Sequence, residues 1–158
     1  MAQDIFLKIE GINGESLDDS HKDEIDVTEW GWSMAQESDQ HAGSGGGAGK
    51  ASVSDLTFAH FVDRASPNLM KYCLSGKHID EVVLCVRKAG GSPLEFLKIT
   101  MNDVIISTVS MSGTNTKLEE TVSLSFAKVT QEYIVQNAQG GSGGAVTAGF
   151  DIKANKET

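Results

Sequence analysis

The longest regular pattern in the chain is a run without glycine or proline over residues 114–139. Leu118, Val122 and Leu124 share one parity of this run, and small or polar residues occupy the other. A two-residue period predicts a half-buried β-strand. Because strands usually contain only about 3 to 10 residues, we expect this element either to bend into two strands or to extend past its own domain and leave backbone groups that need a partner.

Shorter segments of alternating or apolar residues predict further strands. They lie at 5–9, 25–36, 51–61, 82–88, 94–101, 104–111 and 146–152. In the second of these, Trp30 and Trp32 share one parity, and two indoles on one strand face either pack in the core or stack on a ligand. We favour core packing, in which case the small residues Gly31 and Ser33 point away from the core.

One helix is predicted between Ser66 and Gly76. Ser66 is a suitable N-cap, Pro67 suits the first helical position, and Gly76 can end the helix in a left-handed conformation. An apolar stripe is expected to pack on a sheet, and it contains Leu69, Met70, Cys73 and Leu74. Many strands with one short helix predict a mainly β fold, a β-barrel-like or two-sheet domain with the helix packed at its side.

Length and charge narrow the classes of function. The chain has 158 residues, which is enough for one domain over 1–158 with a sizeable core. Lys plus Arg number 13 against 22 Asp plus Glu, for a formal net charge of -9. No basic cluster is available to neutralise phosphates, so neither nucleic acid nor an anionic membrane surface is an expected partner.

The cysteines and the N-terminal sequence indicate the compartment. Cys73 and Cys85 both lie in apolar segments, which is typical of reduced, buried thiols in a protein folded in a cytoplasm. The N-terminal segment lacks the basic and apolar parts of a secretory signal. No apolar run is long enough to span a membrane, so we expect no membrane insertion.

Two glycine-rich segments imitate catalytic motifs without their essential residues. Gly49 and Lys50 end a glycine run as in a Walker A loop, but Ala51 stands where Ser or Thr would bind magnesium. The segment 140–144 has the spacing of a nucleophile elbow around Ser142, yet no histidine follows it. A small hydrolase would therefore need a nucleophile and a base that only the fold could bring together.

Candidate metal ligands are also scattered. Zinc-binding atoms are offered by a set whose spacing matches no compact zinc motif: Cys73, His78, Asp80 and Cys85. Burial is the simpler explanation of both cysteines. The acidic stretch over 18–26 lacks the glycine that turns an EF-hand loop. We therefore expect no catalytic residue, no metal site and no cofactor.

A collinear set of short motifs covers almost the whole chain. It comprises Gly14-Glu15-Ser16 with His21, Ile25-Asp26-Val27, the GGGAGK loop, Ser54-Asp55-Leu56, SPNLM from Ser66, GKH from Gly76, Arg87-Lys88-Ala89-Gly90-Gly91 and Glu95-Phe96-Leu97-Lys98-Ile99. Each fragment alone is weak, but their order resembles the haemolysin-coregulated protein (Hcp) family, the tube subunit of bacterial type VI secretion. The least family-like parts are 118–119 and the insert at 140–144.

The resemblance implies a barrel-like domain that assembles into homohexameric rings around a wide channel. Stacked rings would form a tube inside a contractile sheath, and the tube would be driven with a spike into a target cell. Some family members carry small effector proteins in the channel. The protein would be made in the bacterial cytoplasm and then secreted without a signal peptide.

We assign roles to three groups of residues on this basis. Gly31 and Ser33 are expected to face the channel and its cargo. The small strand face is expected to contact the next subunit, or else to line the channel; it contains Thr121, Ser123 and Ser125. Loops at the ring faces are expected to contact the stacked ring, at Gly45, Gly46, Gly47, Gly90, Gly91 and Asn155.

Two other interpretations remain open at this point. One is a monomeric, soluble β-sandwich binding module that acts through the face of Trp30 and Trp32. The other is a phage tail-tube protein, which is similar in fold and differs in the genes that surround it.

Overall fold

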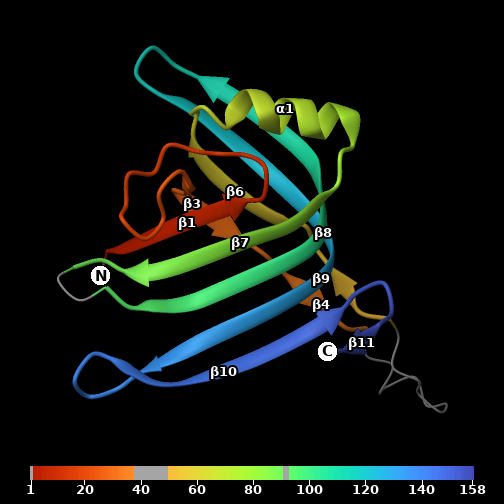
Figure 1. Cartoon of the computed structure of the whole chain (residues 1–158). Helices are drawn as coiled ribbons and strands as arrows, with labels where there is room; N and C mark the ends of the chain where they lie inside the picture. The colour runs from red at the N-terminus through yellow and green to blue at the C-terminus, as the bar shows by residue number, and fades with distance from the viewer. Residues whose placement is uncertain (1, 38–49, 91–92) are drawn as a thin grey trace.

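The computed structural model describes residues 2–37, 50–90 and 93–158. It is built mainly from β-strands, with one short helix at the side, which confirms the predicted fold class (Figure 1). In chain order the elements are β1 (Gln3–Ile9), β2 (Ile25–Asp26), β3 (Glu29–Gly31), β4 (Met34–Ala35), β5 (Ser52–Val53), β6 (Leu56–Phe61), α1 (Ser66–Ser75), β7 (Ile79–Lys88), β8 (Glu95–Gly113), β9 (Leu118–Gln136), β10 (Ser142–Asp151) and β11 (Lys156–Glu157).

Within the described ranges, nine strands form one branched antiparallel sheet. Its main path runs β11–β10–β9–β8–β7–β1–β2, and β6 pairs with both β9 and β3. The segment 25–31 bridges β1 and β6, because β2 pairs with β1 and β3 pairs with β6. The pairing is interrupted between β2 and β3, so these described strands form a barrel-like, two-layered arrangement and not a closed barrel. β4 and β5 form a separate two-stranded ribbon.

The core lies between the β1–β7–β8 layer and the layer that contains β6. Alternate residues face it over most of each strand, as the period of two requires, and the buried parity shifts by one residue at 102–103 in β8 and at 126–127 in β9. Leu7, Leu84 and Ile99 come from the first layer, Phe58 comes from the second, and all four are almost fully buried. Burying side chains of this size contributes roughly 1.5–3 kcal/mol each to folding.

The strand β9 is a single element of 19 residues. One of its edges pairs with β8 almost throughout. The other edge pairs with β6 over 119–124 and with β10 over much of 128–136. The predicted long strand is therefore confirmed. It does not divide into two strands, and strands of the same chain pair with most of both its edges.

The strand β8 is also longer than predicted. The sequence indicated two strands over 94–101 and 104–111, divided at the polar pair Asn102 and Asp103, whereas the structure has one strand of 19 residues. Asp103 adopts a left-handed φ of 54°. The β8–β9 register nevertheless continues unchanged, with Asn102 opposite Lys128 and Val104 opposite Phe126. Asp103 therefore interrupts the alternation of apolar residues in the sequence but does not interrupt the pairing of the two strands.

The predicted C-terminal end of α1 is confirmed, whereas the predicted N-cap is wrong. Gly76 ends the helix with a φ of 66°, in the left-handed region that glycine tolerates. The N-cap is Ala65 and not Ser66, which is already helical. The Ser66 hydroxyl instead accepts a hydrogen bond from the amide of Asp63 at 3.2 Å and donates one to Glu120 at 2.9 Å.

The apolar stripe predicted for α1 is wrong in part. Leu69 is fully buried and Cys73 is half-buried against the core, as expected. Met70 and Leu74, however, are 53% and 80% exposed. The helix packs on β8 through a narrow face, so its remaining apolar side chains stay at the surface. No helix among the described residues is long and apolar enough to cross a membrane.

Candidate functional site

An open hollow of about 610 Å³ lies on the outer side of β3, β6 and β9. It is lined by Gly31, Ser33 and Thr121, among other residues. The strand register explains why these residues meet: Gly31 pairs with Thr57 of β6, and two residues further along β6, Ala59 pairs with Thr121 of β9. Two of the residue groups that the sequence singled out are thus brought to one surface.

The two tryptophans form the inner wall of this hollow. Trp30 and Trp32 are both half-buried and pack against the core. The Trp32 ring lies edge-on to Phe126, with 5.8 Å between the ring centroids, and its Nε1–H donates to the carbonyl of Ser54 at 3.1 Å. The predicted core packing of the indoles is confirmed, and so is its consequence that Gly31 and Ser33 are exposed.

The lining of the hollow is small and polar, with acidic groups among it. Glu29 and Asp55 contribute carboxylates, and Thr57 shares a hydroxyl–hydroxyl hydrogen bond of 3.0 Å with Ser123. A Cβ placed on Gly31 would have nothing within 4 Å. The hollow can therefore accept a polypeptide surface through hydrogen bonds, and there is room at Gly31 for a larger side chain to obstruct it.

The small face of β9 divides between two depressions. Thr121 is exposed in the hollow, and Ser123 is half-buried next to it. Ser125 is exposed and borders a second depression of about 130 Å³, which it shares with Asp103 and Lys153. The predicted outward orientation of this face is confirmed, whereas its contact with another subunit stays a prediction.

The predicted stacking loops are only partly visible. Gly45, Gly46, Gly47 and Gly91 lie outside the described residues. Gly90 is exposed after β7 with a φ of 127°, and Asn155 is exposed in the turn between β10 and β11 with a φ of 53°. These two connections lie at opposite ends of the molecule (Figure 1). Their contacts with another ring also stay a prediction.

A buried polar group that the sequence analysis missed lies between α1 and the sheet. His60 Nε2 is 2.8 Å from Glu120 Oε1, and the Ser66 hydroxyl donates to the same oxygen. Serine, histidine and glutamate are the residue types of a hydrolase, but here the serine contacts the carboxylate and not the imidazole, and all three are buried. The arrangement supports a structural role and not nucleophilic catalysis.

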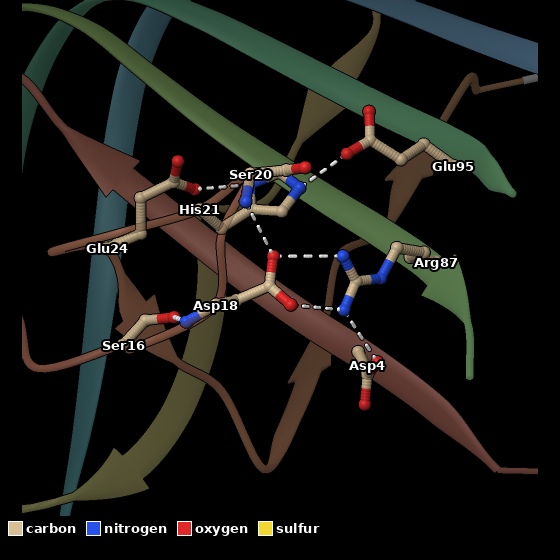
Figure 2. A network of polar contacts seen from close by, with 8 residues as sticks. All are labelled: Asp4, Ser16, Asp18, Ser20, His21, Glu24, Arg87 and Glu95. Carbon is tan, nitrogen blue, oxygen red and sulfur yellow. Dashed lines mark hydrogen bonds and ion pairs between the residues drawn. The ribbon is translucent and has the colours of Figure 1, made fainter. Parts of the chain in front are cut away.

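A second polar network ties the segment before β2 to the outer side of β1, β7 and β8 (Figure 2). Arg87 of β7 donates two hydrogen bonds to Asp18, at 2.7 and 3.0 Å, and one to Asp4 of β1 at 3.0 Å. The Arg87 guanidinium lowers the pKa of Asp18 below its usual range, and both carboxylates raise the pKa of Arg87. The guanidinium also lies 5.0 Å from the ring centroid of Phe6.

The same network contains a cluster of potential metal ligands that spacing did not reveal. His21 contacts Glu24 and Glu95 through its two ring nitrogens. In the part of the chain that the structure describes, His21, Cys85 and Glu95 are the one group of such residues whose ligand atoms converge. The zinc-ligand set considered from the sequence shares only Cys85 with this cluster. Its other cysteine, Cys73, lies on α1.

Comparisons with known proteins identify the family. A family model described as "Type VI secretion system effector, Hcp" matches residues 6–133. The chain is 46% identical over 159 residues to protein Hcp1 of Pseudomonas aeruginosa PAO1, with 98% of both chains covered. The crystal structure of Hcp1 from Salmonella typhimurium is 56% identical, covers 100% of both chains and superposes with a TM-score of 0.85.

A further solved structure, a type VI secretion system effector from Yersinia pestis, is 47% identical and covers 94% of this chain and 100% of its own, with a TM-score of 0.79. The match therefore extends over sequence, fold and nearly the full length. The chain belongs to the Hcp family of type VI secretion system effectors.

Proposed function

We propose that this chain is the tube subunit of a type VI secretion system, one domain over residues 1–158 that acts by assembly and not by catalysis. Six copies form a ring, and rings stack into a tube that is surrounded by the sheath and exported with the spike. Membership in the Hcp family supports the proposal. The observation that best supports a ring is an exposed apolar surface at one end of β9.

This surface, the arm patch, consists of Tyr133, Val135 and Val146. Their exposed fractions are 48%, 44% and 66%. Tyr133 and Val146 are direct cross-strand partners, and Val135 shares the parity of Tyr133, so all three project from one side of the sheet. The same side packs Val129 into the core further along β9. Apolar surface that continues from a core and then lies uncovered is typical of an interface.

A second uncovered apolar surface, the tip patch, lies at the other end of β9. It consists of Met111 and Leu118, which are 53% and 51% exposed. Met111 pairs with the buried Glu120, and Leu118 shares the parity of Glu120, so both project from the core-facing side. Contact between an arm patch and the tip patch of the next copy joins two different surfaces, and such heterologous contacts close into a ring when the rotation permits.

The hollow around Gly31 supports the carrying of cargo. Its outward orientation, its small side chains and the carboxylates of Glu29 and Asp55 suit a small effector protein that presents polar or basic groups. The ring holds this surface toward the channel, where Ser33 and Thr121 add hydroxyl groups. Small lining residues leave the channel wide.

Gly90 and Asn155 support stacking. They lie on exposed connections at opposite ends of the molecule (Figure 1), so one ring can present the β7–β8 connection to the β10–β11 turn of the next ring. The subunit is made in the bacterial cytoplasm and leaves the cell within the tube.

Electron microscopy of the purified protein tests this proposal. Rings with an open centre are expected, together with a hexamer as the main species in native mass spectrometry. A monomer that persists over a wide range of concentrations and buffers would contradict the ring and would favour a monomeric β-sandwich binding module.

A further inference from the structure

The outer side of β7 carries a pocket of metal-binding atoms beneath the segment 14–24. Cys85 lies directly opposite Phe6 in the β1–β7 pairing. The His21 ring stacks on Phe6, with 4.3 Å between ring centroids and 8° between ring planes. Cys85 is 2% exposed and His21 is 8% exposed. The imidazole is therefore held in a fixed orientation next to a buried thiol.

Each ring nitrogen of His21 contacts a carboxylate, and one of these carboxylates belongs to the more exposed side chain of Glu95. Nδ1 lies 2.9 Å from Glu24 Oε1, and Nε2 faces the carboxylate of Glu95 (Figure 2). A neutral imidazole has a single N–H. If that proton is on Nδ1 and is donated to Glu24, the lone pair of Nε2 points at the lone pairs of Glu95. A metal ion between the two groups relieves this repulsion once the Glu95 carboxylate moves back from the ring to admit it.

Cys85 supplies the third ligand atom. Its Sγ, an imidazole nitrogen of His21 and a carboxylate oxygen of Glu95 all lie within 4.8 Å of one another. In a tetrahedral zinc site, bond lengths of about 2.0–2.3 Å separate ligand atoms by roughly 3.3–3.6 Å. The widest of these separations can exceed that spacing by roughly 1.2–1.5 Å, and the Glu95 oxygen lies too close to His21 Nε2 to admit an ion between them, so binding requires the Glu95 side chain to shift. The Glu95 side chain is 37% exposed and has room to adjust.

The geometry points to a binding site for one divalent transition-metal ion, of the zinc type, coordinated by His21 Nε2, Cys85 Sγ and a Glu95 oxygen. Nitrogen, sulfur and oxygen donors together suit zinc. Glu24 acts as the outer carboxylate that orients the imidazole through Nδ1, an arrangement common in zinc proteins. Solvent supplies the fourth ligand on the side of Glu95.

The surrounding charges favour the cation. Cys85 enters the site as a buried thiol beside the Glu95 carboxylate. On binding, the S–H bond breaks, a metal–sulfur bond forms and the proton passes to the solvent. The carboxylates of Glu24 and Glu95, which disfavour a free thiolate, stabilise the ion. Lys98, opposite Cys85 in the β7–β8 pairing, is exposed and opposes binding only weakly.

Such an ion would fasten the segment 14–24 to β7 and β8. This segment has little regular structure. In the described part of the chain it is held by the Arg87 network, by contacts of Arg64 with Gly14, Glu15 and Asp23, and by backbone hydrogen bonds within itself. The role is structural and lies outside the proposed assembly surfaces, so the test of the site is independent of ring formation.

Titration of the full-length, chelator-treated protein with cobalt(II) tests the site. We expect a thiolate-to-cobalt charge-transfer band in the near ultraviolet that saturates at one ion per chain and disappears when zinc is added. Cys85→Ser should abolish the band. Cys73→Ser, which alters the other cysteine, should leave it intact. A wild-type protein without the band, or a band that depends on Cys73, would overturn the proposal.

A second variant, Glu95→Gln, tests the site even if Cys85→Ser does not fold. Glu95→Gln changes a partly exposed side chain and keeps its size, so the metal-free protein should retain its far-ultraviolet circular dichroism. Cobalt affinity should fall by roughly tenfold or more, as for loss of a zinc ligand or its outer carboxylate. Unchanged affinity in a folded Glu95→Gln protein would exclude Glu95 from the site and contradict the proposed coordination.

Discussion

His60 Nε2 lies 2.8 Å from Glu120 Oε1, and both side chains are almost completely removed from solvent. The pair joins β6 to β9 at the point where the Ser66 hydroxyl of α1 also reaches Glu120. One carboxylate therefore connects three elements. A buried pair of this kind is costly to break, because removing one member leaves the other without compensation.

We expect Glu120→Ala to lower the free energy of unfolding by about 3–5 kcal/mol, the usual cost of breaking a buried pair. Urea unfolding followed by circular dichroism measures it. The control is Glu119→Ala on the neighbouring residue, which makes only a surface ion pair with Lys117 at 2.8 Å. This control should change the free energy by less than about 1 kcal/mol. Equal effects of the two substitutions would show that the buried pair has no special role.

The stability of the protein should depend on pH through His60. Burial alone would lower the pKa of His60, but the carboxylates of Asp63 and Glu120 outweigh it and raise the pKa above the usual value of 6.5. The folded state thus binds this proton more tightly than the unfolded state. Its contribution is fully present below pH 6.5 and is lost as the pH rises through the raised pKa.

Comparison of the wild type with His60→Gln isolates this effect. Free energies of unfolding measured in urea from about pH 5.5 to about pH 9 should converge as the pH rises, because only the wild type loses the contribution of the proton. A constant difference between the two proteins across this range would mean that His60 has the same pKa in the folded and unfolded states.

Gly14→Ala should destabilise the segment that covers the outer side of β1 and β7. A Cβ at Gly14 would lie 2.5 Å from the carbonyl oxygen of Glu24, a backbone atom that cannot move aside cheaply. We expect a loss of about 1–3 kcal/mol, typical of overpacking. Gly31→Ala is the control, because its Cβ would meet nothing within 4 Å, and its effect should stay within about 0.5 kcal/mol. Thermal unfolding distinguishes the two.

Gly31→Gln should preserve the ring and reduce effector binding. The longer side chain projects into the hollow, where it occupies space that the cargo needs. Retention of small effector proteins co-expressed from the same secretion locus should fall by roughly tenfold, equivalent to about 1.4 kcal/mol. Ser75→Gln, a substitution of similar size at the exposed end of α1, should retain them. Unchanged retention in Gly31→Gln would remove Gly31 from the cargo surface.

Val146→Asp should dissociate the ring by placing a carboxylate in the arm patch. A hot-spot contact at the centre of an interface is worth about 2 kcal/mol or more, and each ring contains the contact repeatedly. Native mass spectrometry should show monomers with unchanged circular dichroism. Thr147→Asp adds the same charge on the opposite side of β10 and should leave the hexamer intact. An intact hexamer in Val146→Asp would show that the arm patch lies outside the interface.

The parity of apolar residues predicted the strands well but did not identify where polar residues enter the core. Glu120 shares the parity of the buried Val122 and Leu124, and His60 shares that of Leu56. In each of the two strands, the sequence therefore places one ionisable residue on the apolar face. Only the register of β6 against β9 places the two residues opposite each other.

Other differences have local physical causes. Asp103 divided a predicted strand because polar residues usually mark turns, yet its left-handed φ fits within the continuous β8. The cluster joins His21 of the segment 14–24 to Cys85 and Glu95 on the paired strands β7 and β8, and no spacing rule finds such a set. The outward orientation of Gly31 could be predicted because it follows from the period of the strand alone.

The two-sided pairing of β9 has a mechanical consequence. Antiparallel hydrogen bonds lie perpendicular to the strands, so a force directed along β9 loads its bonds to β8, β6 and β10 together, in shear. Bonds loaded in this way share the force and do not open one after another. A subunit that is pushed or pulled along this strand therefore resists deformation, because many hydrogen bonds must break at the same time.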